Sequence, residues 1–166
     1  MDFKKILDAS KLPIVIGVIF NVVLIVVNSL FSIFVGQTGL LGAIVAILAF
    51  LPGILMTMIN YTGNALIYSY AGFSAAKKFR PLIECGVVSS FSFVVVSILS
   101  WIVLVVLLVI QLILLPSSSS SSYLPPIFTS ALVLGLAIAG LVASLVVGTA
   151  VNFVLGLIGG LLGGAK

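Results

Sequence analysis

The chain has 166 residues, of which 63% are hydrophobic and only 6% are charged, and its mean hydropathy is +1.50. Water-soluble domains carry about 25% charged residues, so this composition excludes a soluble globular fold and indicates an integral membrane protein. The net charge of +4 comes from basic residues scattered in three places, which form no continuous phosphate-binding surface, so no nucleic acid is expected as a partner.

Residues 1–12 mix charged and apolar side chains at roughly helical spacing. They predict either a small helix at the headgroups or a polar lead-in. A charge-free run follows from 13 to 35, and about 20 residues suffice to cross a bilayer. We expect a first span here, with Pro13 in its first turn, where the missing N–H of proline costs nothing.

A second apolar run covers residues 40–76 after a short turn at 36–39, which makes the two runs antiparallel neighbours. It is longer than one untilted crossing at about 1.5 Å per residue. Pro52 is expected to kink it, because proline removes a backbone hydrogen bond inside a helix. Residues 13–76 are therefore predicted to form a first transmembrane hairpin.

Residues 77–86 are predicted to be a basic cytoplasmic loop between the hairpins. The second hairpin covers 87–166, with spans at about 87–115 and 127–162. Its Ser/Pro loop, 116–126, has the composition of a flexible linker, or alternatively of a site for O-linked sugar. The glycine-rich tail is expected to fray at the interface. The predicted fold is an all-α, integral membrane four-helix bundle built of two transmembrane hairpins.

The charges predict the orientation of this bundle. In a four-span arrangement every basic residue falls on one side, whereas the turns at 36–39 and 116–126 carry no charge. The positive-inside bias then places both termini and the central loop in the cytoplasm, with Lys77, Lys78 and Arg80 as topology determinants. Three or five spans would scatter the lysines to both sides.

The fourth predicted span has a small or polar residue at every fourth position. Small residues let helix backbones approach closely in lipid, so this row indicates a helix–helix seam, with span two or another subunit as its partner. A glycine-lined pore wall is the alternative. The row consists of Gly140, Ser144, Gly148, Asn152, Gly156 and Gly160.

Four further asparagines fall within the first two spans: Asn21, Asn28, Asn60 and Asn64. An amide in hydrocarbon requires a partner, so these residues predict hydrogen bonds between helices. The alternative is a polar lining for a small neutral solute. No Asp, Glu, Lys, Arg or His lies within any predicted span, which disfavours ion-coupled pumping.

The sequence offers almost nothing for catalysis. It has one cysteine, Cys85, no histidine and only three acidic residues, and it contains no nucleophile–base pair, phosphate loop or metal-ligand cluster. We therefore expect a protein that is not an enzyme and that uses no cofactor and no metal.

The aliphatic, glycine-rich style, the serine run at 117–122 and the tail NFVLGLIGGLLGGAK resemble small polytopic membrane proteins of archaea. They also resemble hydrophobic virion proteins of spindle-shaped archaeal viruses, whose capsid subunits are membrane-like helical hairpins. The resemblance implies a structural role and transfers no functional residue.

The sequence as a whole predicts a structural or assembly role through helix packing. The expected partners are lipid and copies of the chain or other membrane subunits. The alternatives are a small channel or facilitator for a neutral solute and an accessory subunit of a larger complex.

Overall fold

The computed structural model describes residues 3–36, 42–78, 81–114 and 126–166, with side chains described outside 31–52, 111–134 and 136–137. These residues form four helices, α1 (Phe3–Gly36), α2 (Gly42–Ala76), α3 (Leu82–Leu114) and α4 (Pro126–Leu162). The prediction of an all-α chain with four helices is confirmed.

Three stretches within these helices are long and apolar enough to cross a membrane: Phe3–Leu30, Leu82–Ile110 and Ile138–Leu162. Membrane association is the direct reading of that composition. The described part of α2 contributes no such stretch, because its residues 60–64 bring polar side chains into the middle of the helix.

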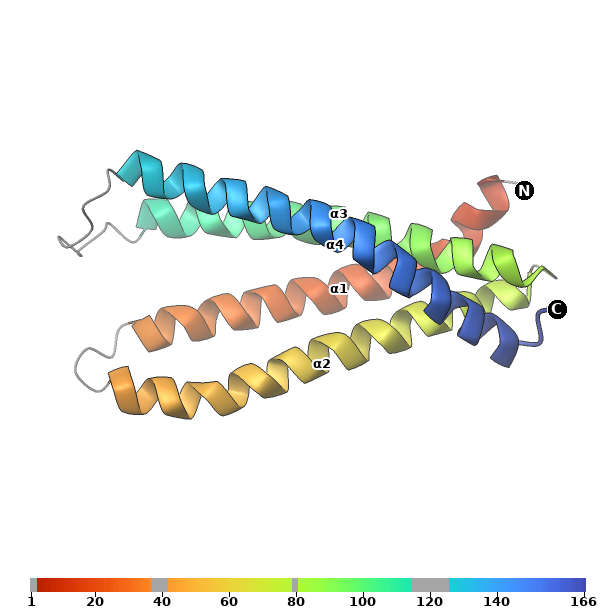
Figure 1. The fold of residues 1–166 in the computed structure, drawn as a ribbon, viewed down its shortest axis with the longest axis horizontal. Coiled ribbons are helices and arrows are strands. Elements are labelled where there is room, and N and C mark those ends of the chain that lie inside the picture. Colours follow the sequence, from red (N-terminus) through yellow and green to blue (C-terminus); the bar gives the residue numbers. More distant parts are fainter. Residues whose placement is uncertain (1–2, 37–41, 79–80, 115–125) are drawn as a thin grey trace.

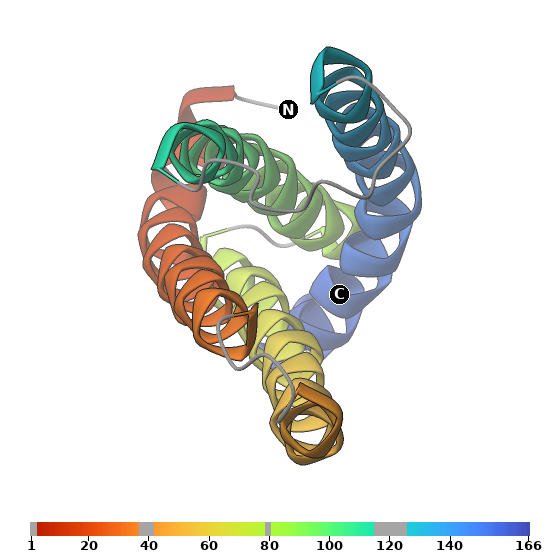
Figure 2. The ribbon, with the colours of Figure 1, turned by 90° about the vertical axis from the view of Figure 1, so that its left-hand side faces the viewer.

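Around the bundle the helices follow the order α1, α2, α4, α3 (Figure 2). Helices α1 and α3 start at the same end of the molecule, whereas α2 and α4 run in the opposite direction and finish there (Figure 1). Each helix packs against two neighbours, and α2 also contacts α3 across the centre of the bundle.

Both chain termini and the turn between α2 and α3 lie at one end of the bundle, which we call the basic end (Figure 1). All charged residues that the structure describes belong to this end: Lys4, Lys5, Asp8, Lys11, Lys77, Lys78, Glu84 and Lys166. Asp2 and Arg80 lie outside the described residues. One end of an otherwise apolar bundle therefore carries the described charge.

Helix α1 begins ten residues before the predicted span, and Pro13 lies inside it and not in its first turn. The first turns are held in the helix by tertiary packing, since Ile6 and Ala9 are buried in the core. Because proline interrupts the backbone ladder, the helix changes direction in its red N-terminal portion (Figure 1).

The predicted basic loop 77–86 is shorter in the structure, because α3 already begins at Leu82. Pro81 precedes the helix, and Glu84 lies in its first turn, where a negative charge is favourable next to the exposed N–H groups. Helix α2 continues through Pro52 as one helix. It bends near its orange end (Figure 1).

The bundle has two halves of different packing. The packed half, next to the basic end, comprises 3–18, 67–78, 82–96 and 148–166. The open half comprises 19–30, 53–66, 97–110 and 138–147. Among the described side chains of the open half, Ser100 is the only buried one. Figure 1 shows the helices converging toward the basic end and spreading apart away from it.

The core lies in the packed half and consists mainly of small and β-branched side chains, with Tyr68 as the largest one that is fully buried. Its central cluster combines residues of α1, α2 and α3 with the C-terminal tail: Ile6, Ala9, Ala75, Cys85, Val88 and Ala165. Many large apolar side chains lie on the outside, as Val146 (69% exposed) and Leu162 (76% exposed) illustrate. Exposed apolar surface of this extent is what a lipid-facing protein requires.

The C-terminal tail is tied down and does not fray. Helix α4 is followed by Gly164, which has a positive φ of 87°. The Gly164 N–H donates to the Leu161 carbonyl, and the Ala165 N–H donates to the Gly160 carbonyl. These two bonds define a Schellman cap. The Lys166 carbonyl then accepts the N–H of Leu82 at 3.2 Å, which satisfies a donor at the start of α3.

Candidate functional site

The predicted α4 row divides between the two halves of the bundle. Its part in the packed half faces α3. A Cβ on Gly156 would lie 2.5 Å from the Ser89 Cβ and 2.8 Å from the Cys85 carbonyl oxygen. One on Gly160 would lie 2.8 Å from the Cys85 Cβ, and Gly148 faces the Phe93 ring in the same way. These glycines allow α3 and α4 to approach at backbone distance.

Helix α2 meets α4 through a second set of small residues, which the four-residue spacing did not single out. Gly72 lies against the backbone of Gly156, with no room for a methyl group between them. Gly159 lies equally close to the Ser69 carbonyl oxygen. A Cβ on Gly163 would be 2.6 Å from that of Ala76. Within the packed half, these small residues therefore bring α2, α3 and α4 into one three-helix contact.

The rest of the row lies in the open half, where its described side chains are exposed. Gly140 is exposed, and a Cβ on it would meet nothing within 4 Å. Ser144 is exposed as well, and its hydroxyl donates to the Leu141 carbonyl of its own helix at 2.9 Å. One face of α4 therefore carries small residues that pack in one half and remain uncovered in the other.

Asn152 is buried in the packed half, but it does not join two helices. Its Nδ2 donates to the Gly148 carbonyl of the same helix at 2.7 Å. Two bonds that join α3 to its neighbours come from its serines instead. Ser89 donates to the Tyr68 carbonyl of α2 at 2.9 Å, and Ser90 donates to the Thr149 carbonyl of α4 at 3.1 Å. The serine-rich start of the predicted third span was the available signal for these bonds.

Three of the four remaining asparagines form a ladder of amides between α1 and α2. Asn21 Nδ2 donates to Asn64 Oδ1 at 3.0 Å, and Asn64 Nδ2 donates to Asn60 Oδ1 at 2.6 Å. Asn21 Nδ2 also donates to the Gly17 carbonyl at 2.9 Å. The side-chain carbonyl oxygens and N–H groups of these asparagines are thus paired with one another, and polar groups surrounded by lipid need such partners.

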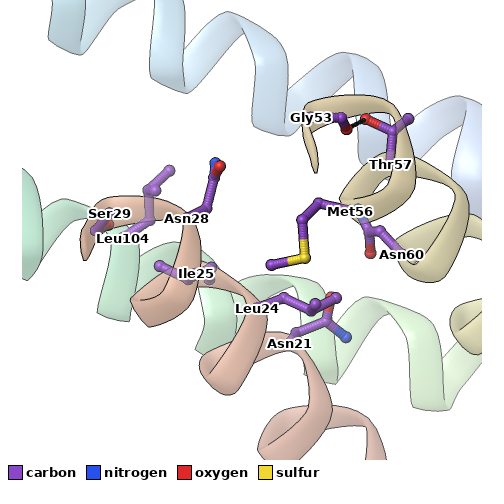
Figure 3. A pocket seen from close by; sticks show the side chains of 10 residues that line it. All are labelled: Asn21, Leu24, Ile25, Asn28, Ser29, Gly53, Met56, Thr57, Asn60 and Leu104. Carbon is purple, nitrogen blue, oxygen red and sulfur yellow. Dashed lines mark hydrogen bonds between the residues drawn. The ribbon is translucent and has the colours of Figure 1, made fainter. Parts of the chain in front are cut away.

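Beside this ladder, a partly open cleft of about 210 Å³ lies between α1 and α2, with Leu104 of α3 behind it (Figure 3). Met56 reaches from α2 toward α1 across it. The side chain of Asn28 is exposed here and has no hydrogen bond to any described residue. The polar residues of the lining are Asn21, Asn28, Ser29, Thr57 and Asn60.

This cleft, which we call the asparagine cleft, and the glycines of α4 do not share a cavity. None of the ten residues that line the cleft comes from the described part of α4. Uncharged amides and hydroxyls can hold water or a small neutral solute by hydrogen bonds, but they provide no nucleophile and no acid or base. Among the described residues, no three His, Cys, Asp or Glu side chains lie close enough together to hold a metal ion.

Two of the predicted topology residues, Lys77 and Lys78, directly follow the last residue of α2, whereas Arg80 lies outside the described residues. Lys77 Nζ is 5.0 Å from the centroid of the Phe73 ring, and Lys78 Nζ donates to the Asp8 carbonyl at 3.1 Å. This last contact joins the end of α2 to the first turns of α1. Both lysines are exposed.

No protein family model, no curated protein and no solved structure matches this chain. The resemblance to membrane and virion proteins of archaea and their viruses stays a prediction.

Proposed function

We propose that this chain is a multi-pass membrane protein with a non-enzymatic, structural role in assembly. Its four helices cross the bilayer as two hairpins, with both termini in the cytoplasm. The packed half holds the protomer together, and the open half associates with further copies of the chain. In a virus this would be the role of an envelope or capsid subunit.

The four-crossing topology is supported by the length of α2 and by the position of the charges. Its 35 residues extend about 52 Å at the usual helical rise, which exceeds the hydrocarbon thickness. The polar stretch of α2 is covered in part by Asn21 of α1, which bonds to the amide of Asn64. The described lysines all lie at the basic end, as expected for a cytoplasmic side.

The single observation that carries the assembly role is the uncovered small-residue face of α4. Gly156 and Gly160 are in contact with α3, whereas Gly140 of the same row has open space around it. Helices associate in lipid by close packing of small residues, since apolar burial gives no driving force there. A helix of a second copy could therefore pack against Gly140 as closely as α3 packs against Gly156.

The test compares Gly140→Leu with Gly53→Leu, two substitutions at helical glycines that have open space around them. Each variant would be purified in mild detergent and its mass measured by light scattering. We expect Gly140→Leu to keep its helicity and thermal stability but to shift the chain toward the monomer, while Gly53→Leu keeps the parent mass. An unchanged mass in Gly140→Leu would contradict assembly through this face.

A second function is favoured by one observation, the asparagine-lined cleft. A facilitator for a small neutral solute would use the hydrogen-bonding groups of Asn28 and Asn60 in place of water. Gly53 lines this cleft, so Gly53→Leu would fill it. Liposome flux of glycerol or urea that is abolished by Gly53→Leu and unaffected by Gly140→Leu would support the facilitator and count against the structural role.

The partner of the open half could also be another membrane subunit. Copurification from the native membrane after chemical cross-linking separates the two cases. Cross-links between copies of the chain that depend on Gly140 support self-assembly, whereas cross-links to a different protein alone would make the chain an accessory subunit.

A further inference from the structure

We propose that a cleft between α1 and α2 at the basic end binds the phosphate headgroup of an anionic phospholipid. This cleft is distinct from the asparagine cleft, and the proposal depends on membrane insertion but not on self-assembly. Its volume is about 270 Å³, comparable to about nine water molecules at roughly 30 Å³ each. The lining residues are Asp8, Ala9, Leu12, Tyr70, Phe73, Ser74, Lys77 and Lys78.

The charges of the cleft favour an anion. Lys77 and Lys78 contribute two ammonium groups from the end of α2. The Asp8 carboxylate is the one acidic group of the lining, and its Oδ1 is paired with Lys11 Nζ at 2.6 Å. Lys78 is directed to the backbone carbonyl of Asp8 and not to its carboxylate, at 3.1 Å. The cleft therefore keeps a positive charge, and each ammonium retains N–H groups for a phosphate oxygen.

The position of the two lysines is fixed on both sides of the cleft. The Lys77 ammonium stands 5.0 Å over the Phe73 ring, which holds it close to the cleft wall. The Lys78 contact to Asp8 bridges the two helices across the opening. Both cationic side chains thus have a contact at the cleft before any ligand arrives, which reduces the entropy lost on binding.

The surroundings match a lipid better than a soluble anion. The cleft lies at the end of α2, at the depth where headgroups meet the membrane surface, and Tyr70 adds a hydroxyl that is typical of this zone. Leu12 and Phe73 form apolar wall in the same cleft. Deeper along the same two helices, Ile16, Ile19 and Leu66 are exposed, at 41%, 60% and 67%, and offer apolar surface to acyl chains. Basic pockets between membrane helices on the cytoplasmic side bind anionic headgroups in this way.

The experiment is native mass spectrometry of the full chain, purified in detergent and supplied with equal amounts of phosphatidylglycerol and phosphatidylcholine. We expect bound lipid to be enriched in phosphatidylglycerol. The double variant Lys77→Gln/Lys78→Gln should lower this enrichment roughly tenfold to thirtyfold. Each lysine near an anionic membrane surface contributes an electrostatic attraction of roughly fivefold in affinity, and the variant removes two of them. Lys77→Arg/Lys78→Arg should keep it.

The matched control is Lys5→Gln/Lys166→Gln, which removes the same charge from the basic end outside the cleft. An equal loss in both double variants would overturn the site, because it would mean that only the general positive field attracts the lipid. If the double variant at 77 and 78 does not fold, Lys77→Gln alone should still lower the enrichment roughly fivefold. Light scattering on the same samples reports assembly separately, so a failed lipid site and a failed assembly role are distinguishable.

Discussion

The packed and open halves of this bundle are built from similar residues and differ in what covers them. Gly156 and Gly140 belong to one row on α4, yet a Cβ on Gly156 would collide with α3, whereas a Cβ on Gly140 would meet nothing within 4 Å. Ser89 and Ser100 belong to α3 and are both buried, yet Ser89 bonds to Tyr68 of α2 and Ser100 has no hydrogen-bond partner among the described residues. Small and polar residues therefore do not define a contact in a membrane protein; the presence of a complementary helix does.

The largest expected difference between the halves concerns an added methyl group. Gly72→Ala should destabilise the chain by about 3 kcal/mol, because the new Cβ overlaps the Gly156 backbone and neither helix can yield locally. Gly140→Ala adds the same group in open space and should be neutral or stabilise its helix by up to about 1 kcal/mol. Unfolding in a graded detergent mixture measures both, and equal effects would contradict the division into two halves.

The asparagine ladder should give the next largest effect. A double-mutant cycle of Asn21→Leu and Asn64→Leu should show a coupling free energy of about 0.6 to 1.7 kcal/mol, the range measured for hydrogen bonds between membrane helices. Asn28→Leu is the control, since its exposed amide bonds to no described residue. A cycle with zero coupling would show that the ladder contributes nothing to the α1–α2 contact.

The cap of α4 should have an effect of similar or slightly smaller size. Gly164→Ala should cost about 1 kcal/mol, because an alanine at φ 87° brings its Cβ close to the following carbonyl. Nothing lies within 4 Å of a Cβ at this position, so strain in the backbone and not a clash is the cause. Thermal unfolding followed by circular dichroism would measure it, and an unchanged melting temperature would argue against the cap.

The smallest difference separates two buried serines of α3. Ser89→Ala should destabilise the chain by about 0.6 kcal/mol through loss of its bond to α2. Ser100→Ala should be neutral or stabilising, because it removes a buried hydroxyl that has no described partner. Chemical unfolding of both variants under one condition gives the comparison, and a larger cost at Ser100 would mean that this hydroxyl is bonded.

Periodicity and charge were enough to predict the helices. The runs at 13–35, 40–76, 87–115 and 127–162 correspond to α1, α2, α3 and α4. A charge-free run of this length forms a helix in lipid, because a helix satisfies its backbone N–H and C=O groups internally. The starts of α1 and α3 were placed too late. The helical spacing of residues 1–12 left a small helix and a polar lead-in as alternatives, and it is the burial of Ile6 and Ala9 in one cluster with Ala75 and Cys85 that joins them to α1.

The helix contacts were harder to predict than the helices. The spacing of Gly148, Gly156 and Gly160 indicated a seam but could not name α3 as its partner. Gly72 and Gly159 were missed because each contacts a backbone atom of another helix, and no four-residue spacing connects them. The tail was expected to fray from its glycine content, but the positive φ of Gly164 uses that same glycine to end the helix and bury Ala165.

The spread of the helices away from the basic end gives the protomer a tapered outline (Figure 1). In a bilayer crossed as proposed, such a body displaces more lipid from the outer leaflet than from the cytoplasmic one. Many copies side by side would relieve this mismatch by bending the membrane, with its convex surface on the side opposite the lysines.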